Sequence, residues 1–97
     1  MYGTVARLRV KAGQRQALIE IMQEWNRERR PKVKGAQTGH ILLPDSEPNQ
    51  AIIMAVFDDK DTYMANAADP DQDKWYQRFR ELLDADPEWT DGEIQEG

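Results

Sequence analysis

The stretch Gln50-Ala51-Ile52-Ile53-Met54-Ala55-Val56-Phe57 is the most apolar run in this chain of 97 residues. Its length and its β-branched content predict a strand that carries apolar side chains on both of its faces. A strand of this kind is stable only where other parts of the protein cover both faces. We therefore expect residues 50–57 to lie inside a sheet that has a packed layer on each side.

Three further segments have the pattern of strands. Residues Tyr2 to Val10 alternate, with one apolar face and a second face that carries Arg7 and Arg9, which is typical of a half-buried strand. Residues 35–43 end in a short apolar run, and the polar loop 44–49 with its two prolines predicts a hairpin connection to residues 50–57. Residues 89–96 form a weaker, polar last strand.

The remaining segments have apolar residues at helical spacing. Residues 14 to about 29 place apolar side chains on one face, arginines follow at the C-terminal end, and Pro31 is expected to stop the helix. Residues 62–67 predict a short helix after an acidic turn. Asp69-Pro70-Asp71-Gln72 has the pattern of a new start, with an N-cap Asp, Pro at the first helical position and Gln three residues after the cap. Asp86-Pro87 is expected to end that helix.

The predicted order of elements is β-α-β-β-α-β, with the second helix in two pieces, over a single domain of residues 1–97. This is an α+β, ferredoxin-like arrangement, in which both crossovers place their helices on one face of a four-stranded sheet. The other face is then bare, although the strand 50–57 brings apolar side chains to it. Two copies packed sheet to sheet would cover that face, and an isologous pair is the commonest such solution.

Composition excludes several classes of function. The net charge of -5 argues against nucleic acid as a partner, and no stretch approaches the length of a membrane helix. The absence of cysteine excludes disulfides and thiolate metal sites, and the start of the chain shows no apolar signal segment, so we expect a cytoplasmic location. The basic run 27–34 is interpreted as a solvated helix end or a seam between subunits, with phosphate binding as the alternative.

Two longer stretches carry a family resemblance. They are VARLRVKAGQRQAL at residues 5–18 and AVFDDKDTYMANAADPDQDKWYQRF at residues 55–79. With these stretches the chain resembles the antibiotic biosynthesis monooxygenase-like proteins of the dimeric α+β barrel superfamily. The resemblance implies a ferredoxin-like subunit, a homodimer and a small pocket between helices and sheet in each subunit.

The resemblance also implies candidate activities. One branch of the family contains monooxygenases that act on phenols and need no flavin, metal or other cofactor. The deprotonated phenol can give an electron directly to oxygen. A haem-degrading branch uses an Asn on the first strand, where this chain has Ala6, and a His that the long helix lacks. Haem degradation is therefore not expected.

Candidate site residues follow from the chemistry of a phenol pocket, which needs an apolar cage, an orienting polar group and a donor for the anion. The catalytic candidates are Asn66, Tyr76 and Arg80, and the candidates for the substrate pocket are Trp25, His40, Tyr63, Trp75 and Phe79. Nothing in the sequence predicts a metal site, because the single histidine has no His or Cys partners.

Each of these residues also has a structural interpretation. Trp25, Trp75 and Phe79 recur at helical spacing and are expected first in the core, while His40 is expected to face the partner subunit or solvent. The sequence leaves two functions open. One is a cofactor-independent monooxygenase acting on a small aromatic or conjugated carbonyl compound. The other is a non-catalytic, ligand-binding or stress-related dimer.

Overall fold

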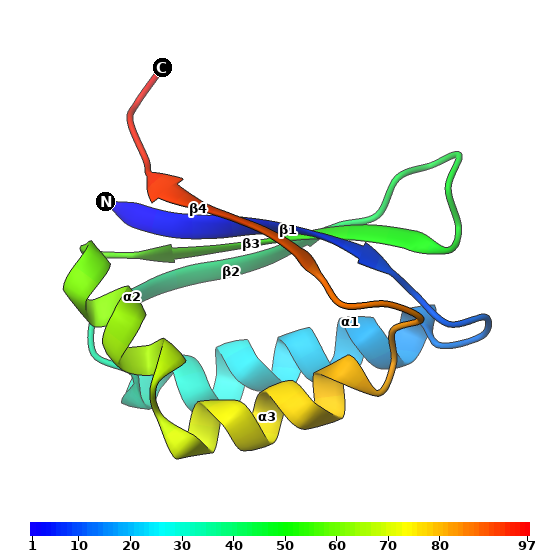
Figure 1. Cartoon of the computed structure of the whole chain (residues 1–97), viewed down its shortest axis with the longest axis horizontal. Helices are drawn as coiled ribbons and strands as arrows, with labels where there is room; N and C mark the ends of the chain where they lie inside the picture. The colour runs from blue at the N-terminus through cyan, green and yellow to red at the C-terminus, as the bar shows by residue number, and fades with distance from the viewer.

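The computed structural model describes residues 1–97 as one antiparallel sheet packed against helices (Figure 1). The sheet has the strand order β2-β3-β1-β4. Its strands are β1 (Tyr2–Arg9), β2 (Ala36–Leu42), β3 (Gln50–Phe57) and β4 (Glu88–Glu93). The helices are α1 (Arg15–Glu24), α2 (Lys60–Ala67) and α3 (Pro70–Arg80), with a π-helical turn η1 (Trp25–Arg29) and a 3₁₀ turn η2 (Arg30–Lys32) after α1. The predicted α+β, ferredoxin-like class is confirmed.

The apolar strand β3 lies inside the sheet, between β1 and β2. Its bounds match the prediction, and its register pairs Met54 with Val5 on one side and with His40 on the other. The weaker strand β4 is shorter than predicted and pairs only with β1, at the sheet edge. The central strand thus fixes which residues of its neighbours share each face.

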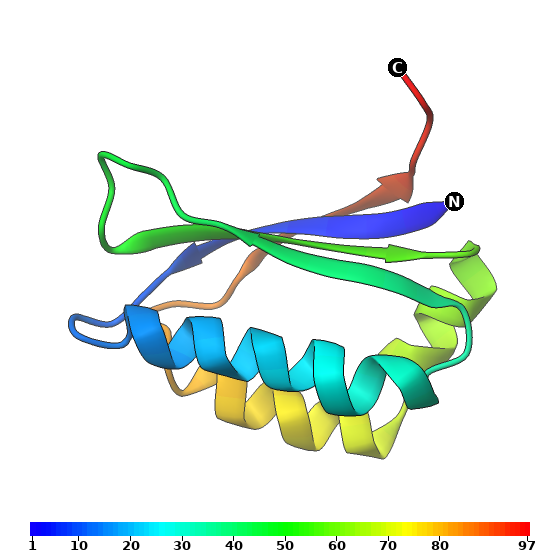
Figure 2. The ribbon, with the colours of Figure 1, turned by 180° about the vertical axis from the view of Figure 1, so that it is seen from behind.

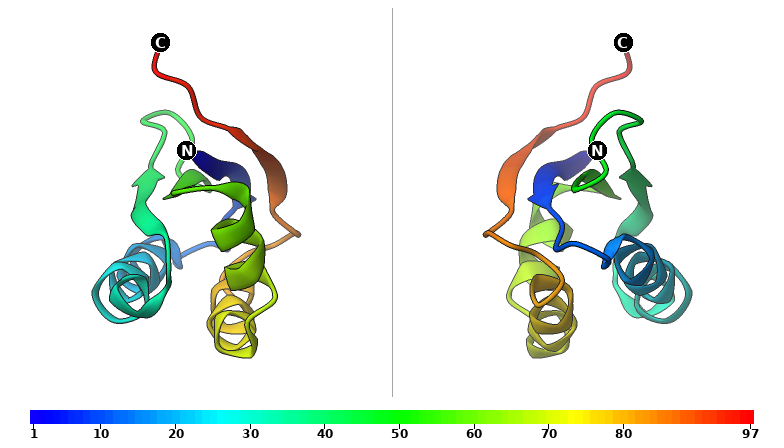
Figure 3. Two further views of the ribbon diagram at one scale, coloured as in Figure 1. Left: turned by 90° about the vertical axis from the view of Figure 1, so that its left-hand side faces the viewer. Right: turned by 90° about the vertical axis from the view of Figure 1, so that its right-hand side faces the viewer.

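One face of the sheet carries all the helices. Figure 3 shows α1 beneath the β2 side of the sheet and α3 beneath the β4 side, with α2 leading from β3 down to α3. The core between these layers includes Leu8, Phe57 and Phe79, each at most 2% exposed. Trp25 and Trp75 also belong to this core, as their spacing predicted.

The other face of the sheet has no helix on it (Figure 2). Val5, Leu42 and Met54 lie on this face and are exposed, and Ile52 and Val56 of the same face are half-buried. The prediction that β3 brings apolar side chains to both faces is therefore confirmed. Met54 and Val5 meet at the centre of this open face, through the pairing of β3 with β1.

The end of the first helix differs from the prediction. The α-helix stops at Glu24, five residues of π-helix follow, and the helical path continues to Lys32. Pro31 does not end the helical path, because it sits in the first turn of η2, where a missing N–H costs no hydrogen bond. The π-turn carries Trp25 and Arg29, and both side chains reach α3 through Gln72.

The two later helices begin at their predicted caps. The Asp59 carboxylate accepts a hydrogen bond from the Thr62 amide, and the Asp69 carboxylate accepts one from the Asp71 amide. Pro70 then opens α3 in the position that favours proline. Gln72, however, does not fold back onto its own helix end as a capping box would require, since its side chain binds residues of η1 instead. None of the helices is both long enough and apolar enough to cross a membrane.

Candidate ligand-binding site

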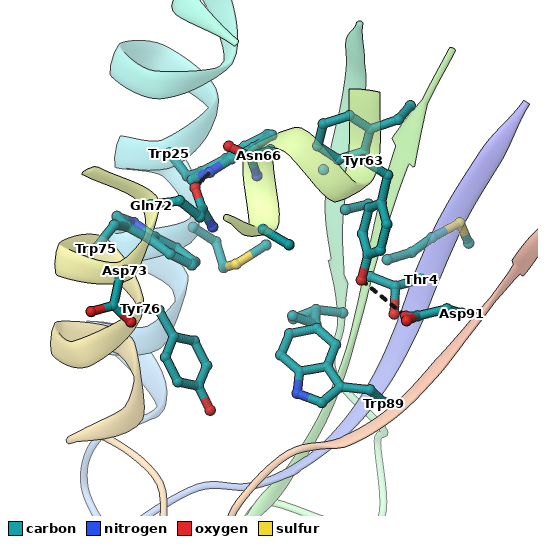
Figure 4. Close-up of a pocket in the computed structure, with 17 residues that line it drawn as sticks. Thr4, Trp25, Tyr63, Asn66, Gln72, Asp73, Trp75, Tyr76, Trp89 and Asp91 are labelled. Carbon is teal, nitrogen blue, oxygen red and sulfur yellow. Dashed lines mark hydrogen bonds between the residues drawn. The ribbon is translucent and has the colours of Figure 1, made fainter. Parts of the chain in front are cut away.

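A cavity of about 370 Å³ lies between the sheet and the helix layer, on the side where α2 and α3 approach β4 (Figure 4). Every strand of the sheet and all three α-helices contribute to its lining. The exposed residues Trp89 and Asp91 on β4 and Asp73 on α3 lie at its rim, so the cavity opens to solvent between these two elements. Its volume suits a ligand with a few fused rings.

Aromatic side chains make the walls of the cavity. Trp25 and Trp75 are nearly buried, and the Trp75 indole N–H donates to the carbonyl of Ile21 across 3.2 Å. Tyr76 and Trp89 face each other across the mouth, with ring centroids 6.4 Å apart. Indole and phenol rings on several sides favour a flat, apolar ligand body, because stacking adds to simple burial.

One end of the cavity is built around Arg29. Its side chain is only 17% exposed. The guanidinium donates to Oε1 of Gln72 across 3.3 Å and to Oδ1 of Asn66 across 3.2 Å. The indole N–H of Trp25 donates to the same Gln72 oxygen across 3.0 Å, and an Asp69 carboxylate oxygen lies 3.9 Å from the guanidinium. The Gln72 and Asn66 amides therefore sit together in a fixed arrangement.

The opposite wall carries a tyrosine and a carboxylate. The Tyr63 hydroxyl donates to Oδ1 of Asp91 across 2.9 Å (Figure 4). Burial, together with this hydrogen bond to the carboxylate, raises the pKa of Tyr63 to about 12. Beside it, the Thr4 hydroxyl donates to the carbonyl of Thr90 across 3.2 Å. Tyr63 thus remains protonated at neutral pH, with its proton engaged by Asp91.

Tyr76, on α3 across the cavity from Tyr63, has a hydroxyl that makes no hydrogen bond within the protein (Figure 4). Its ring packs between Phe79 and Trp89. Burial and the nearby Asp86 carboxylate raise the pKa of Tyr76, and the Arg80 guanidinium offsets part of that effect. Tyr76 therefore presents a neutral phenol that is free to donate to a ligand at neutral pH.

The structure brings five of the eight sequence-predicted residues to this cavity, namely Trp25, Tyr63, Asn66, Trp75 and Tyr76. His40 lies on the open face of the sheet, because it pairs with Met54 in the register that faces away from the helices. The Arg80 side chain turns outward to Asp86 and to the Leu83 carbonyl. Phe79 is fully buried behind Trp75, on which it stacks with centroids 5.2 Å apart.

Sequence reasoning missed Arg29, Gln72, Trp89 and Asp91. Gln72 carried a signal, but that signal was interpreted as helix capping. Arg29 was hidden in a basic run of the kind that usually ends a helix. Trp89 and Asp91 reach the cavity only through the pairing of β4 with β1, which no local pattern reveals. No group of three or more His, Asp or Glu side chains in the structure is arranged to hold a metal ion.

The fold and the cavity together define a class of protein, a ferredoxin-like α+β subunit with a ligand-sized cavity between its sheet and its helices. The model of the antibiotic biosynthesis monooxygenase family, ABM, matches residues 1–78. The chain belongs to this family, as the two quoted stretches predicted. The matched region contains Arg29, Asn66, Gln72 and Tyr76 but ends before β4.

Solved structures share the fold at low sequence identity. A conserved protein from Methanosarcina mazei is 15% identical with a TM-score of 0.82, and the match covers 97% of this chain and 92% of that one. Proteins from Chloroflexus aurantiacus and Deinococcus radiodurans carry the antibiotic biosynthesis monooxygenase name provisionally. The Chloroflexus aurantiacus protein is 23% identical with a TM-score of 0.73, and the match covers 99% of this chain and 96% of that one. The Deinococcus radiodurans protein is 21% identical with a TM-score of 0.75, and the match covers 100% of this chain and 95% of that one. Comparison with curated proteins finds no match.

Proposed function

We propose that this protein is a cofactor-independent monooxygenase that acts on a small aromatic or conjugated carbonyl compound carrying a phenolic hydroxyl. In such a reaction the phenol and O₂ give a quinone and water. One oxygen atom enters the ring in place of hydrogen, and the other leaves as water. The substrate itself supplies the electrons, so the protein has to bind, orient and hold charge rather than carry a redox group.

The observation that carries this proposal is the combination of aromatic walls with hydrogen-bond donors that have no protein acceptor. Trp25, Trp75 and Trp89 form the walls for a flat ring system. The Asn66 amide and the Tyr76 hydroxyl can each donate to an oxygen that becomes negative as the phenol loses its proton. Donors fixed before the reaction stabilise such charge strongly in a cavity shielded from water.

We also propose that two copies pack their open sheet faces together as a homodimer. Met54 and Leu42 are 41% and 57% exposed on that face in a single subunit, beside half-buried Ile52 and Val56. An apolar stripe across the centre of a sheet is typical of a surface that is covered in solution. The helices and the cavity lie on the opposite side, so both cavities of such a dimer stay open.

A second candidate function is ligand binding without turnover in the same dimer. It is favoured by Trp25 and Trp75, which are core residues as much as cavity walls, and by the position of Arg80, which the structure keeps away from the cavity. The cavity is nevertheless open and holds Asn66 and Tyr76. Turnover separates the two functions wherever an aromatic ligand binds, because the second function involves no reaction.

The experiment is a thermal-shift screen with hydroxylated anthraquinones and quinols, followed by oxygen-electrode assays with any compound that binds and by mass spectrometry of the product for one inserted oxygen atom. A ligand that binds only the folded state raises the melting temperature by mass action. Oxygen uptake that is lost in Asn66→Ala and Tyr76→Phe, with binding retained, would support the monooxygenase. Binding without oxygen uptake would favour the non-catalytic dimer. No shift with any of these compounds would contradict the monooxygenase and would also favour the non-catalytic dimer, with the aromatic residues as core.

A further inference from the structure

The orientation of the Gln72 amide is fixed by two neighbours that can only donate. The Trp25 indole and the Arg29 Nε each donate to Oε1 of Gln72, across 3.0 and 3.3 Å. Neither group has an acceptor lone pair, so the reversed amide would place its NH₂ against two N–H groups. The Gln72 oxygen must therefore face η1, and its NH₂ must face the other way. Figure 4 shows that nitrogen directed into the cavity.

The orientation of the Asn66 amide is fixed in the same way. Its Oδ1 accepts a hydrogen bond from Nη2 of Arg29 across 3.2 Å, and arginine is again a donor only. Its NH₂ group therefore points away from Arg29. Asn66 lies at the same end of the cavity as Gln72 (Figure 4). Neither NH₂ group has a hydrogen-bond acceptor within the protein. Asp69, which lies 3.9 Å from the guanidinium, helps to hold Arg29 between the two amides.

We propose that this end of the cavity selects an acceptor oxygen, a quinone carbonyl or a phenolate, on a flat aromatic ligand. We further propose that Arg29 is the positioning residue that imposes this selectivity through Gln72 and Asn66. The inference rests on the proposed function, because it takes the cavity to be the substrate site. A buried amide N–H left without an acceptor is unfavourable, so a ligand that offers no oxygen here loses affinity.

The far wall has the opposite polarity. Asp91 is a carboxylate, which accepts and does not donate when ionised, and the Tyr63 proton is already engaged by it. A ligand hydroxyl therefore fits beside Asp91, while a ligand carbonyl fits at Asn66 and Gln72. The two ends together favour a ring system with a carbonyl at one edge and a hydroxyl at the other.

The test uses two ligands that differ only in the carbonyl groups: a hydroxyanthraquinone, and the hydroxyanthracene with its hydroxyl at the same position. Their dissociation constants are measured by calorimetry at a slightly acidic pH, where both hydroxyls are protonated. Wild type should bind the anthraquinone about tenfold or more tightly than the anthracene, the factor that one well-made hydrogen bond supplies. Gln72→Glu keeps the bonds to Trp25 and Arg29 but presents an oxygen to the cavity. It should reduce the preference to no more than the part that the Asn66 amide supplies.

Two control variants separate this effect from general changes. Gln23→Glu makes the same chemical change at an exposed position of α1 and should keep the preference. Arg29→Met frees the Asn66 amide to rotate and leaves Trp25 as the one donor that fixes Gln72, so it should lower the preference. Arg29→Lys should restore part of it. Arg27→Met should leave the preference intact, because Arg27 is 67% exposed on the same turn.

Three results would overturn the inference. Equal affinity of wild type for the two ligands would show that the amide end does not select an acceptor, while the cavity would remain a binding site for aromatic compounds. A preference that survives in both Gln72→Glu and Arg29→Met would remove these residues from the selectivity. Failure of wild type to bind either compound would contradict the proposed ligand class itself, and the inference would fall with it.

Discussion

Trp25 and Gln72 are joined by a hydrogen bond of 3.0 Å from the indole Nε1 to the amide Oε1, and this bond ties the π-turn after α1 to the first turns of α3. The two residues lie 47 positions apart in the chain. Because the same oxygen also accepts from Arg29, one glutamine connects the wall of the cavity to its polar end. The width of the cavity therefore depends on this contact as well as on apolar packing.

Replacement of Gln72 by Leu should destabilise the protein by about 1–3 kcal/mol, because a nearly buried indole N–H would lose its acceptor and a largely buried guanidinium would lose one of its two side-chain acceptors. Gln72→Glu should cost far less, since a carboxylate oxygen can accept from both donors. Urea unfolding followed by tryptophan fluorescence measures the difference. Equal stability of the Leu variant and wild type would show that water satisfies these donors and that the contact contributes little.

Tyr63 should make the stability of the fold sensitive to alkali. Its pKa is about 12 in the folded state against 10.0 for an unperturbed tyrosine. Below pH 10 both states hold the proton and the stabilisation is fully present. As the pH rises from 10 toward 12, the unfolded state loses its proton first and the free energy of unfolding falls.

Tyr63→Phe should therefore flatten the fall in melting temperature across that alkaline range, even if it lowers the melting temperature at neutral pH. The slope is the decisive readout, because the lost hydrogen bond to Asp91 affects stability at neutral pH as well. A series of thermal melts at increasing pH gives both quantities. An unchanged slope in the variant would contradict the raised pKa of Tyr63.

Gly35 should tolerate no side chain. It has φ +81°, and a Cβ there would lie 2.5 Å from Oγ1 of Thr62, close to the start of α2. Gly13 has a similar φ of +79° but open space around it. Gly13→Ala should therefore cost about 1 kcal/mol from backbone conformation alone. Gly35→Ala should cost clearly more, and the difference between the two variants, measured by urea unfolding, reports the contact with α2. Equal costs would show that Thr62 moves aside freely.

Most of the fold could be predicted because its signals are local. The alternation of residues 2–10, the apolar run 50–57 and the Asp-Pro start at residues 69–70 each specify one element without help from the rest of the chain. The π-turn was not predictable in the same way. Its residues continue a helical pattern, and what distinguishes the turn is the contact of Trp25 and Arg29 with Gln72 on another helix.

The candidate site was predicted less completely for the same reason. Asn66 and Tyr76 lie on helices whose apolar faces were clear, so their approach to the sheet followed from the fold. Asp91 reaches the cavity because Thr4 pairs with it in the register of β1 and β4, and a register between distant strands leaves no mark in either strand alone. Arg80 was expected at the cavity, but an ion pair with Asp86 six residues on holds it at the surface.

The open face of the sheet gives a prediction about assembly. Val56→Asp places a charge on a half-buried strand position and should dissociate or unfold the protein. Met54→Asp is the sharper variant, because Met54 lies on the open face, is 41% exposed in one subunit and is not one of the buried core residues. The subunit should therefore stay folded and lose only its partner.

Sedimentation velocity and far-ultraviolet circular dichroism distinguish these outcomes. Wild type should sediment as a dimer, and Met54→Asp should sediment as a monomer with an unchanged spectrum. Gln50→Asp introduces the same residue at the exposed end of the same strand face and should remain dimeric, because charge there can stay in water. A wild type that is monomeric at all concentrations, or a Met54→Asp dimer as tight as wild type, would show that the apolar stripe is not the interface.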